Sequence, residues 1–204
     1  MKLKRSRAHL AASGLVALLL AVGLPLMARK QQNNAVPEVK PTAQYLGTDV
    51  CKTCHEDLYK KNFEATPHFK TTLEGGHGCE SCHGPGSEHV EGGGDVSKII
   101  RFANLSKQEV NKQCMSCHGE NMKQRHFSSS AHANGDLSCL DCHSPHKAKE
   151  QQHLLVNAEP QLCYGCHLAQ KADFAKPYHH RVNEGLVQCD DCHNVHGTTT
   201  LCRG

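Results

Sequence analysis

A five-residue unit, Cys-x-x-Cys-His, occurs six times in this chain of 204 residues and constrains its fold more than any other feature. On one helical turn, residues i, i+3 and i+4 share a face, so two cysteines and a histidine can reach one porphyrin. The cysteines would form thioethers and the histidine would bind the iron, which is the pattern that attaches a c-type haem. The cysteine pairs are Cys51 and Cys54, Cys79 and Cys82, Cys114 and Cys117, Cys139 and Cys142, Cys163 and Cys166, and Cys189 and Cys192. The histidines that follow them are His55, His83, His118, His143, His167 and His193.

Zinc knuckles and thioredoxin-like redox pairs also use Cys-x-x-Cys, and one copy would leave the choice open. Six copies, each followed directly by a histidine, favour haem attachment over zinc binding or a redox pair. With 17 histidines in 204 residues, a histidine after all six pairs by chance has a probability on the order of one in a million or less. The sequence therefore predicts six covalently bound haem c groups.

The composition predicts a fold that depends on these haems. The chain has no tryptophan, 4% aromatic residues and 38% hydrophobic residues, which is little material for a side-chain core. We expect stacked porphyrins to form most of the apolar interior. The polypeptide would then be a wrapper that is mostly irregular, with short α-helices around the motifs and very little β-structure. Leu105 to Val110, with Ser106 and Glu109 as a capping pair, predicts a helix start before the third motif.

The N-terminus is typical of an export signal. Lys2, Lys4, Arg5 and Arg7 precede an apolar run from Leu10 to Ala28. Residues 1–28 are therefore expected to be a signal peptide or, if uncleaved, an N-terminal membrane anchor, and either places the rest of the chain in the periplasm. Residues 29–47 resemble a polar linker.

Residues 48–204 are expected to form one hexahaem domain of three haem-pair repeats, 48–100, 101–152 and 153–204. The formal charge of +3 belongs mainly to the export segment, because removing residues 1–28 leaves 19 basic against 20 acidic side chains. Six haems would add about twelve propionates. Scattered basic residues without an aromatic platform give no indication of nucleic-acid binding.

Six further histidines are candidates for the second axial ligands. One precedes and one follows the second, fourth and sixth motifs, and together they are His68, His89, His132, His146, His180 and His196. Histidine on both faces closes an iron to substrate and gives a lower potential than histidine–methionine ligation. The assignment of each histidine to a haem stays open, although His146 and His196 lie too near their own motifs to reach the opposite face. Some ligands are therefore expected to cross to neighbouring haems.

Four histidines remain: His77, His126, His153 and His179. We expect them to be exposed or to bond to a haem propionate, and the alternative is that one of them is a distal ligand. His179 competes with its neighbour His180. Cys202 is the odd cysteine after twelve thioethers. It is either an unreactive thiol or a link to another molecule.

Several strings resemble one group of proteins. CESCHGPGSEH, CLDCHSPH, PQLCYGCH and HHRVNEGLVQCDDCHNVHG are similar to segments of the periplasmic decahaem cytochromes of metal-reduction and dimethyl-sulfoxide respiratory conduits. They also resemble the pentahaem donor to periplasmic nitrite reductase. The resemblance covers about residues 45–197. It implies bis-histidine haems in a wire that takes electrons from a membrane-bound quinol-oxidising cytochrome. The acceptor would be a periplasmic reductase or an outer-membrane cytochrome complex, in anaerobic or extracellular respiration.

Two other functions compete with electron transfer. A multihaem reductase of nitrite, hydroxylamine or a sulfur oxyanion would need one iron with an open face, often marked by lysine in place of the motif histidine, whereas all six motifs here end in histidine. A cytochrome filament would need histidines or Cys202 to bridge subunits in an oligomer. The prediction favours an electron carrier with no catalytic residue of its own.

Overall fold

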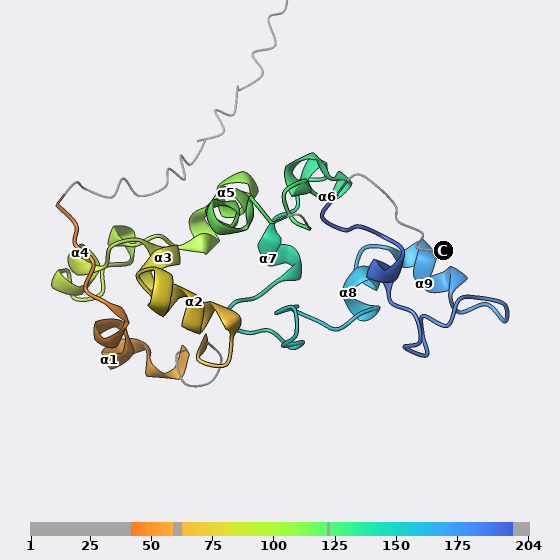
Figure 1. Ribbon diagram of the computed structural model, residues 1–204, viewed down its shortest axis with the longest axis horizontal. Coiled ribbons are helices and arrows are strands. Elements are labelled where there is room, and N and C mark those ends of the chain that lie inside the picture. Colours follow the sequence, from red (N-terminus) through yellow and green to blue (C-terminus); the bar gives the residue numbers. More distant parts are fainter. Residues whose placement is uncertain (1–41, 59–62, 122, 198–204) are drawn as a thin grey trace, which may run out of the picture. The chain divides into compact units, whose positions relative to one another are not determined.

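The computed structural model describes residues 42–58, 63–121 and 123–197 (Figure 1). The expected export segment, most of the linker and Cys202 lie outside these residues. Short helices alternate with irregular segments along the described chain. The α-helices are α1 (Thr48–Leu58), α2 (Pro67–Gly75), α3 (Glu80–His83), α4 (Ser87–Glu91), α5 (Lys107–His118), α6 (Ala131–Asn134), α7 (Cys139–Cys142), α8 (Gln161–Tyr164) and α9 (Leu168–Asp173). Single 3₁₀ turns are η2 (Val96–Lys98), η3 (Phe102–Asn104), η4 (Phe127–Ser129) and η5 (Cys189–Asp191).

β-Structure in the described residues is limited to two isolated antiparallel bridges. Leu155 pairs with both His143 and Glu150, so the bridges hold the segment after the fourth motif in a tight loop. The predicted fold class, short helices in a mostly irregular chain with very little β, is confirmed. No helix within residues 42–58, 63–121 or 123–197 combines the length and the apolar character that crossing a bilayer requires.

The helices begin where local sequence signals place them. In α5 the Ser106 hydroxyl accepts the Glu109 N–H at 3.2 Å, and the Glu109 carboxylate accepts the Ser106 N–H at 2.7 Å. This capping box satisfies two backbone donors at once and confirms the helix start expected before the third motif. Pro67 occupies the first turn of α2, where its missing N–H costs nothing.

Few apolar side chains are buried in the described part of the chain. They are Phe63, Val110, Phe127, Leu154, Tyr164 and Val182. Larger apolar side chains such as Leu168 and Leu186 are 67% and 71% exposed. A set this small does not offset the ordering entropy of a chain of this length, which agrees with an interior made mainly of prosthetic groups.

Candidate haem sites

Each motif lies on or beside a helical turn. The first is in α1, the third forms the last turn of α5, and the other four coincide with α3, α7, α8 and η5. In the second, fourth, fifth and sixth motifs the histidine N–H donates to the carbonyl of the first cysteine, at 2.8–3.1 Å. This i to i−4 bond is the α-helical one, so the two sulfurs and the imidazole of a motif start from one face.

Cysteines of consecutive motifs are near neighbours. The pairs are Cys51 with Cys79, Cys82 with Cys117, Cys114 with Cys139, Cys142 with Cys166, and Cys163 with Cys189. Burial, assisted by the Cys79 thiol, raises the pKa of Cys51 to about 11. Burial, assisted by the Cys189 thiol, raises the pKa of Cys163 to about 12. Consecutive motifs therefore lie near one another in the order in which they occur along the chain.

Five of the six motif histidines face a second imidazole, and we call these the facing pairs. Their ring centroids are 5.9–6.3 Å apart. The facing pairs are His55 with His89, His83 with His146, His118 with His68, His143 with His196, and His167 with His132. Each partner follows or precedes a motif other than the one it faces, as expected for ligands that cross to neighbouring haems.

The spacing of the facing pairs fits an iron between the rings. A metal–imidazole bond of about 2.0 Å plus about 1.1 Å from nitrogen to ring centroid, taken twice, gives about 6.2 Å. Parallel rings stacked face to face lie closer, as in the stack of Tyr45 on His77 at 3.7 Å. The described histidines thus have the separation that axial ligation of haem requires.

Backbone carbonyls fix the orientation of four of these rings. Nδ1 lies 2.7–3.1 Å from a carbonyl oxygen in His83, His89, His132 and His143, where the acceptors are Ile100, Asp95, Val195 and His153 respectively. An Nδ1–H that donates to a carbonyl leaves Nε2 with its lone pair. Hydrogen bonds of this kind are the usual support for metal-binding histidines.

Partial burial holds three of the other rings, those of His68, His146 and His196. Nδ1 of His68 and of His146 is buried without a hydrogen-bond partner. Burial lowers the pKa of His68, His143, His146 and His196, and neighbouring imidazoles lower it further. These side chains are therefore neutral at pH 7, the form in which an imidazole can bind a metal.

The sixth motif differs from the other five. Neither His193 nor His180 has a ring contact within the part of the chain that the structure describes. The structure thus brings five of the six expected distal histidines opposite a motif histidine and leaves His180 apart. His179 is engaged elsewhere, because its ring contacts the Lys176 carbonyl and the Glu184 carboxylate. The ring of His126 accepts a hydrogen bond from Arg125 at 2.9 Å.

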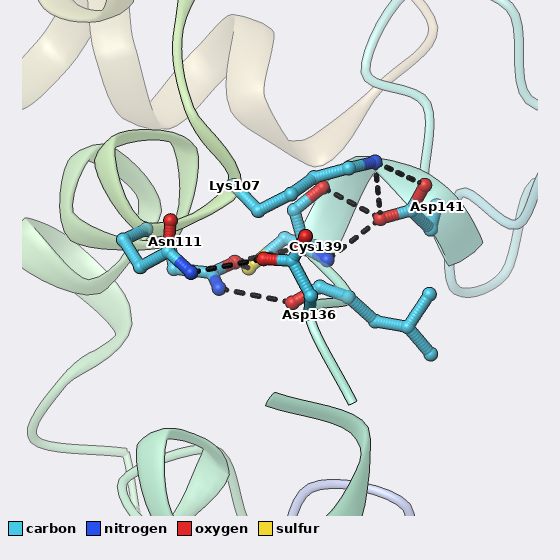
Figure 2. A network of polar contacts seen from close by, with 8 residues as sticks. Lys107, Asn111, Asp136, Cys139 and Asp141 are labelled. Atoms are coloured by element: carbon cyan, nitrogen blue, oxygen red, sulfur yellow. Dashed lines mark hydrogen bonds and ion pairs between the residues drawn. The ribbon is translucent and has the colours of Figure 1, made fainter. Parts of the chain in front are cut away.

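A polar network joins the fourth motif to α5 (Figure 2). Lys107 donates to both carboxylate oxygens of Asp141, at 2.5 and 2.8 Å. The Asn111 side chain accepts the Cys139 N–H at 2.9 Å and donates to the Leu137 carbonyl at 3.1 Å. Partial burial alone would raise the pKa of Asp141, but Lys107 and the Ser138 donors outweigh it, so that the pKa lies below its usual value.

Glu80, inside the second motif, holds the N-terminal segment in place. Its side chain is buried, and its carboxylate accepts the N–H groups of Leu46, Gly47 and Gly86 at 2.7–3.1 Å. Neither Glu80 nor Asp141 was among the residues that the sequence predicts to be important. A signal was available, because the second, fourth and sixth motifs carry an acidic residue between their cysteines and the other three do not.

These sites define a class of protein. Six haem-attachment motifs on helical turns, near one another in chain order, with five motif histidines facing a second imidazole, characterise a multihaem c-type cytochrome. The model for the doubled CXXCH motif matches residues 131–172, and that for cytochrome c554 and c-prime matches residues 25–84. The chain belongs to the multihaem c-type cytochromes.

Two curated relatives give the comparison its detail. The chain is 37% identical to the multiheme cytochrome MtrA of Shewanella baltica over 163 residues, which is 76% of this chain and 47% of that protein. It is 31% identical to the cytochrome c-type protein NrfB of Escherichia coli O6:H1 over 133 residues, 60% of this chain and 66% of that protein. The chain therefore spans less than two thirds of either relative.

Membership of this family argues against the alternative that the cysteine pairs bind zinc. Among the described residues, Glu159, Cys163 and Cys189 bring three potential metal-binding atoms within 4.8 Å of one another. Both cysteines belong to haem motifs, and thioether sulfurs are not the thiolates that zinc requires. Glu159 already has a structural role, since its carboxylate accepts the Cys189 N–H at 2.8 Å. The group is best explained as a contact between the fifth and sixth motifs.

Proposed function

We propose that this protein is a hexahaem electron-transfer protein with no substrate of its own. Its twelve motif cysteines would attach six haems, and its six motif histidines would provide the proximal ligands. The observation that carries the proposal is the set of five facing pairs. An iron with imidazole on both faces exchanges electrons but does not readily admit a substrate, and it sits at low potential.

We infer that the facing pairs supply the distal ligands of the first five haems. His89 would close the first iron, His146 the second, His68 the third, His196 the fourth and His132 the fifth. Support comes from the ring spacing near 6 Å and from the carbonyl acceptors at Nδ1. The haems supply the redox chemistry, and the polypeptide holds them in a fixed order and orientation.

The order of the haems follows from the cysteine contacts. Because each motif has a cysteine beside the next motif's cysteine, consecutive haems would be neighbours, and electrons would pass from the first to the sixth without skipping one. The three haem-pair repeats would then be segments of one wire within residues 48–204.

We place this wire in the periplasm, after export through residues 1–28, which are either removed or kept as an anchor. A membrane-bound quinol-oxidising cytochrome is the proposed donor. A periplasmic reductase or an outer-membrane cytochrome complex is the proposed acceptor, in anaerobic or extracellular respiration. The supports are the export-like N-terminus and the similarity to MtrA and NrfB.

The test uses the holo-protein. Haem is counted per chain by pyridine haemochrome, and the oxidised protein is mixed with membranes that contain a quinol-oxidising cytochrome in a stopped-flow spectrometer. We expect six haems per chain, complete reduction by quinol, and no consumption of nitrite, hydroxylamine or sulfite by the reduced protein. Turnover of any of these compounds at a rate that matches quinol oxidation would overturn the electron-carrier proposal in favour of a reductase.

A further inference from the structure

We propose that the haem of the sixth motif has an exchangeable distal ligand and accepts a neutral nitrogen donor from outside residues 42–197. The inference deepens the proposed function and rests on it, because it assigns a binding site to one haem of the electron-transfer wire. It starts from the difference between His193 and the other five motif histidines. Those five face a second imidazole, whereas His193 has no ring contact among the described residues.

The facing pairs follow two repeated relations along the chain. In the first relation, the histidine that precedes an even-numbered motif faces the histidine of the next odd-numbered motif. His68 precedes the second motif and faces His118 of the third, and His132 precedes the fourth motif and faces His167 of the fifth. Their interplanar angles agree, at 82° and 77°.

In the second relation, the histidine that follows an even-numbered motif faces the histidine of the previous even-numbered motif, two motifs earlier in the chain. His146 faces His83 and His196 faces His143, with interplanar angles of 26° and 17°. Sequence position and ring geometry therefore repeat together. The pair His55 with His89 stands at the start of the series and follows neither relation.

These relations do not assign His180 to His193. His180 precedes the sixth motif, as His132 precedes the fourth, so by the first relation it would face a motif after the sixth. By the second relation, His193 would be faced by a histidine that follows an eighth motif. His196, which follows the sixth motif itself, already faces His143.

Several contacts hold the loop that carries His180. Tyr164 donates to Asn183 at 2.8 Å, and Asn183 donates to the Phe174 carbonyl at 2.7 Å, which ties the loop to α8 and α9. The backbone carbonyl of His180 accepts the Val182 N–H at 2.7 Å, and Val182 is buried. In the arrangement that these contacts hold, the ring of His180 has no contact with that of His193.

The surroundings of the sixth motif select the charge of the ligand. Asp190 and Asp191 lie inside the motif and are exposed, so they place negative charge beside the haem. Anions such as nitrite and cyanide are therefore disfavoured relative to neutral donors. Imidazole is the neutral donor used as a probe, and its natural source would be a small molecule or a histidine of a second copy of this chain.

The experiment is low-temperature electron paramagnetic resonance on the oxidised holo-protein, with haem counted in the same sample. We expect a high-spin signal equal to about one haem of six, which imidazole converts to low spin. The signal should disappear in the double variant Cys189→Ser, Cys192→Ser and persist in the matched variant Cys114→Ser, Cys117→Ser. It should also persist in His180→Ala. A high-spin signal that falls as protein concentration rises would identify the donor as a second copy, and one that does not would identify a small molecule.

Two results would overturn the inference. Six haems that are all low-spin in dilute wild-type protein would overturn the inference but would leave the electron-transfer proposal standing. In that case, a new high-spin signal in His180→Ala would identify His180 as the ligand. A high-spin signal that survives Cys189→Ser, Cys192→Ser would place the exchangeable site elsewhere. A count of five haems with the sixth motif empty would overturn both proposals.

Discussion

The imidazoles of His68 and His118 lie with their ring centroids 5.9 Å apart and their planes at 82°, although 50 positions separate them in the chain. His68 is on α2 and His118 ends α5. An iron between them would close a loop of that length with two bonds and would offset the loop-closure entropy that the small apolar core does not. Ligation and folding would therefore be coupled at this site.

Replacement of His68 by alanine should expose the third iron. The variant His68→Ala removes the distal ligand and leaves His118 as the only axial imidazole, so one more haem per chain should become high-spin and bind carbon monoxide when reduced. Electron paramagnetic resonance and optical titration measure both effects. His77→Ala is the matched control, because His77 stacks on Tyr45 and faces no motif histidine. An unchanged spin state in His68→Ala would contradict the assignment.

The interplanar angles predict two spectroscopic classes among the first five haems. Three facing pairs are near-parallel, at 19°, 26° and 17°, and two are near-perpendicular, at 82° and 77°. Parallel imidazoles split the iron d orbitals and give rhombic low-spin signals, whereas perpendicular imidazoles leave two orbitals nearly degenerate and give a single large g value. Spectra of the oxidised protein should therefore resolve the classes in a ratio of three to two. One uniform low-spin class would contradict these ring orientations.

The sequence predicted the haem motifs, the fold class and the capped start of α5 because each depends on local patterns. Two cysteines and a histidine on one turn, or Ser106 three residues before Glu109, are visible without tertiary structure. The same holds for the candidate distal histidines, five of which lie opposite a motif histidine. The pattern did not reveal which haem each faces, because His146 and His83 are brought together by folding across 63 positions.

The roles of the acidic residues in the motifs depend on tertiary contacts and so could not be predicted from the sequence. Glu80 lies between Cys79 and Ser81 in the sequence, where an exposed carboxylate is the simplest expectation. Its burial depends on the backbone of Leu46 and Gly47, more than thirty positions earlier. The repeated acidic residue in the even-numbered motifs was the available signal. The sequence does not indicate which backbone N–H groups donate to it.

Loss of the Glu80 carboxylate should destabilise the first haem pair. In Glu80→Gln an amide NH₂ replaces one of two oxygens that accept N–H groups from Leu46, Gly47 and Gly86, so at least one buried donor loses its partner. The expected cost is about 1–3 kcal/mol in the free energy of unfolding. Thermal unfolding of the holo-protein measures it, with Glu91→Gln as an exposed control. Equal stability of both variants would show that the Glu80 contacts are energetically neutral.

The ion pair of Lys107 with Asp141 should make stability depend on pH in the acid range. The pKa of Asp141 is lower in the folded chain than its usual value of 3.8, so the unfolded chain binds the proton more readily. The stabilisation is therefore fully present above the usual pKa and is lost as pH falls through the folded pKa, below about pH 4. Its size should be on the order of 1 kcal/mol, because both side chains are partly exposed.

The variant Asp141→Asn tests this dependence. Denaturant unfolding of the holo-protein between pH 3 and pH 7 should give a constant difference from the wild type above about pH 5, and the difference should shrink below about pH 4. Glu120→Gln is the control for removal of an exposed carboxylate. A difference that grows on acidification would have the wrong sign for a carboxylate with a lowered pKa.

The third haem should have the highest potential of the first five. Four facing pairs contain one histidine whose Nδ1 bonds to a backbone carbonyl, whereas among the described contacts His68 and His118 have none. A carbonyl acceptor makes the imidazole a stronger donor, which stabilises ferric iron and lowers the potential. A potentiometric titration should lose its highest low-spin component in Cys114→Ser, Cys117→Ser and retain it in Cys51→Ser, Cys54→Ser. Retention of that component without the third haem would show that hydrogen bonding at Nδ1 does not set the order of the potentials.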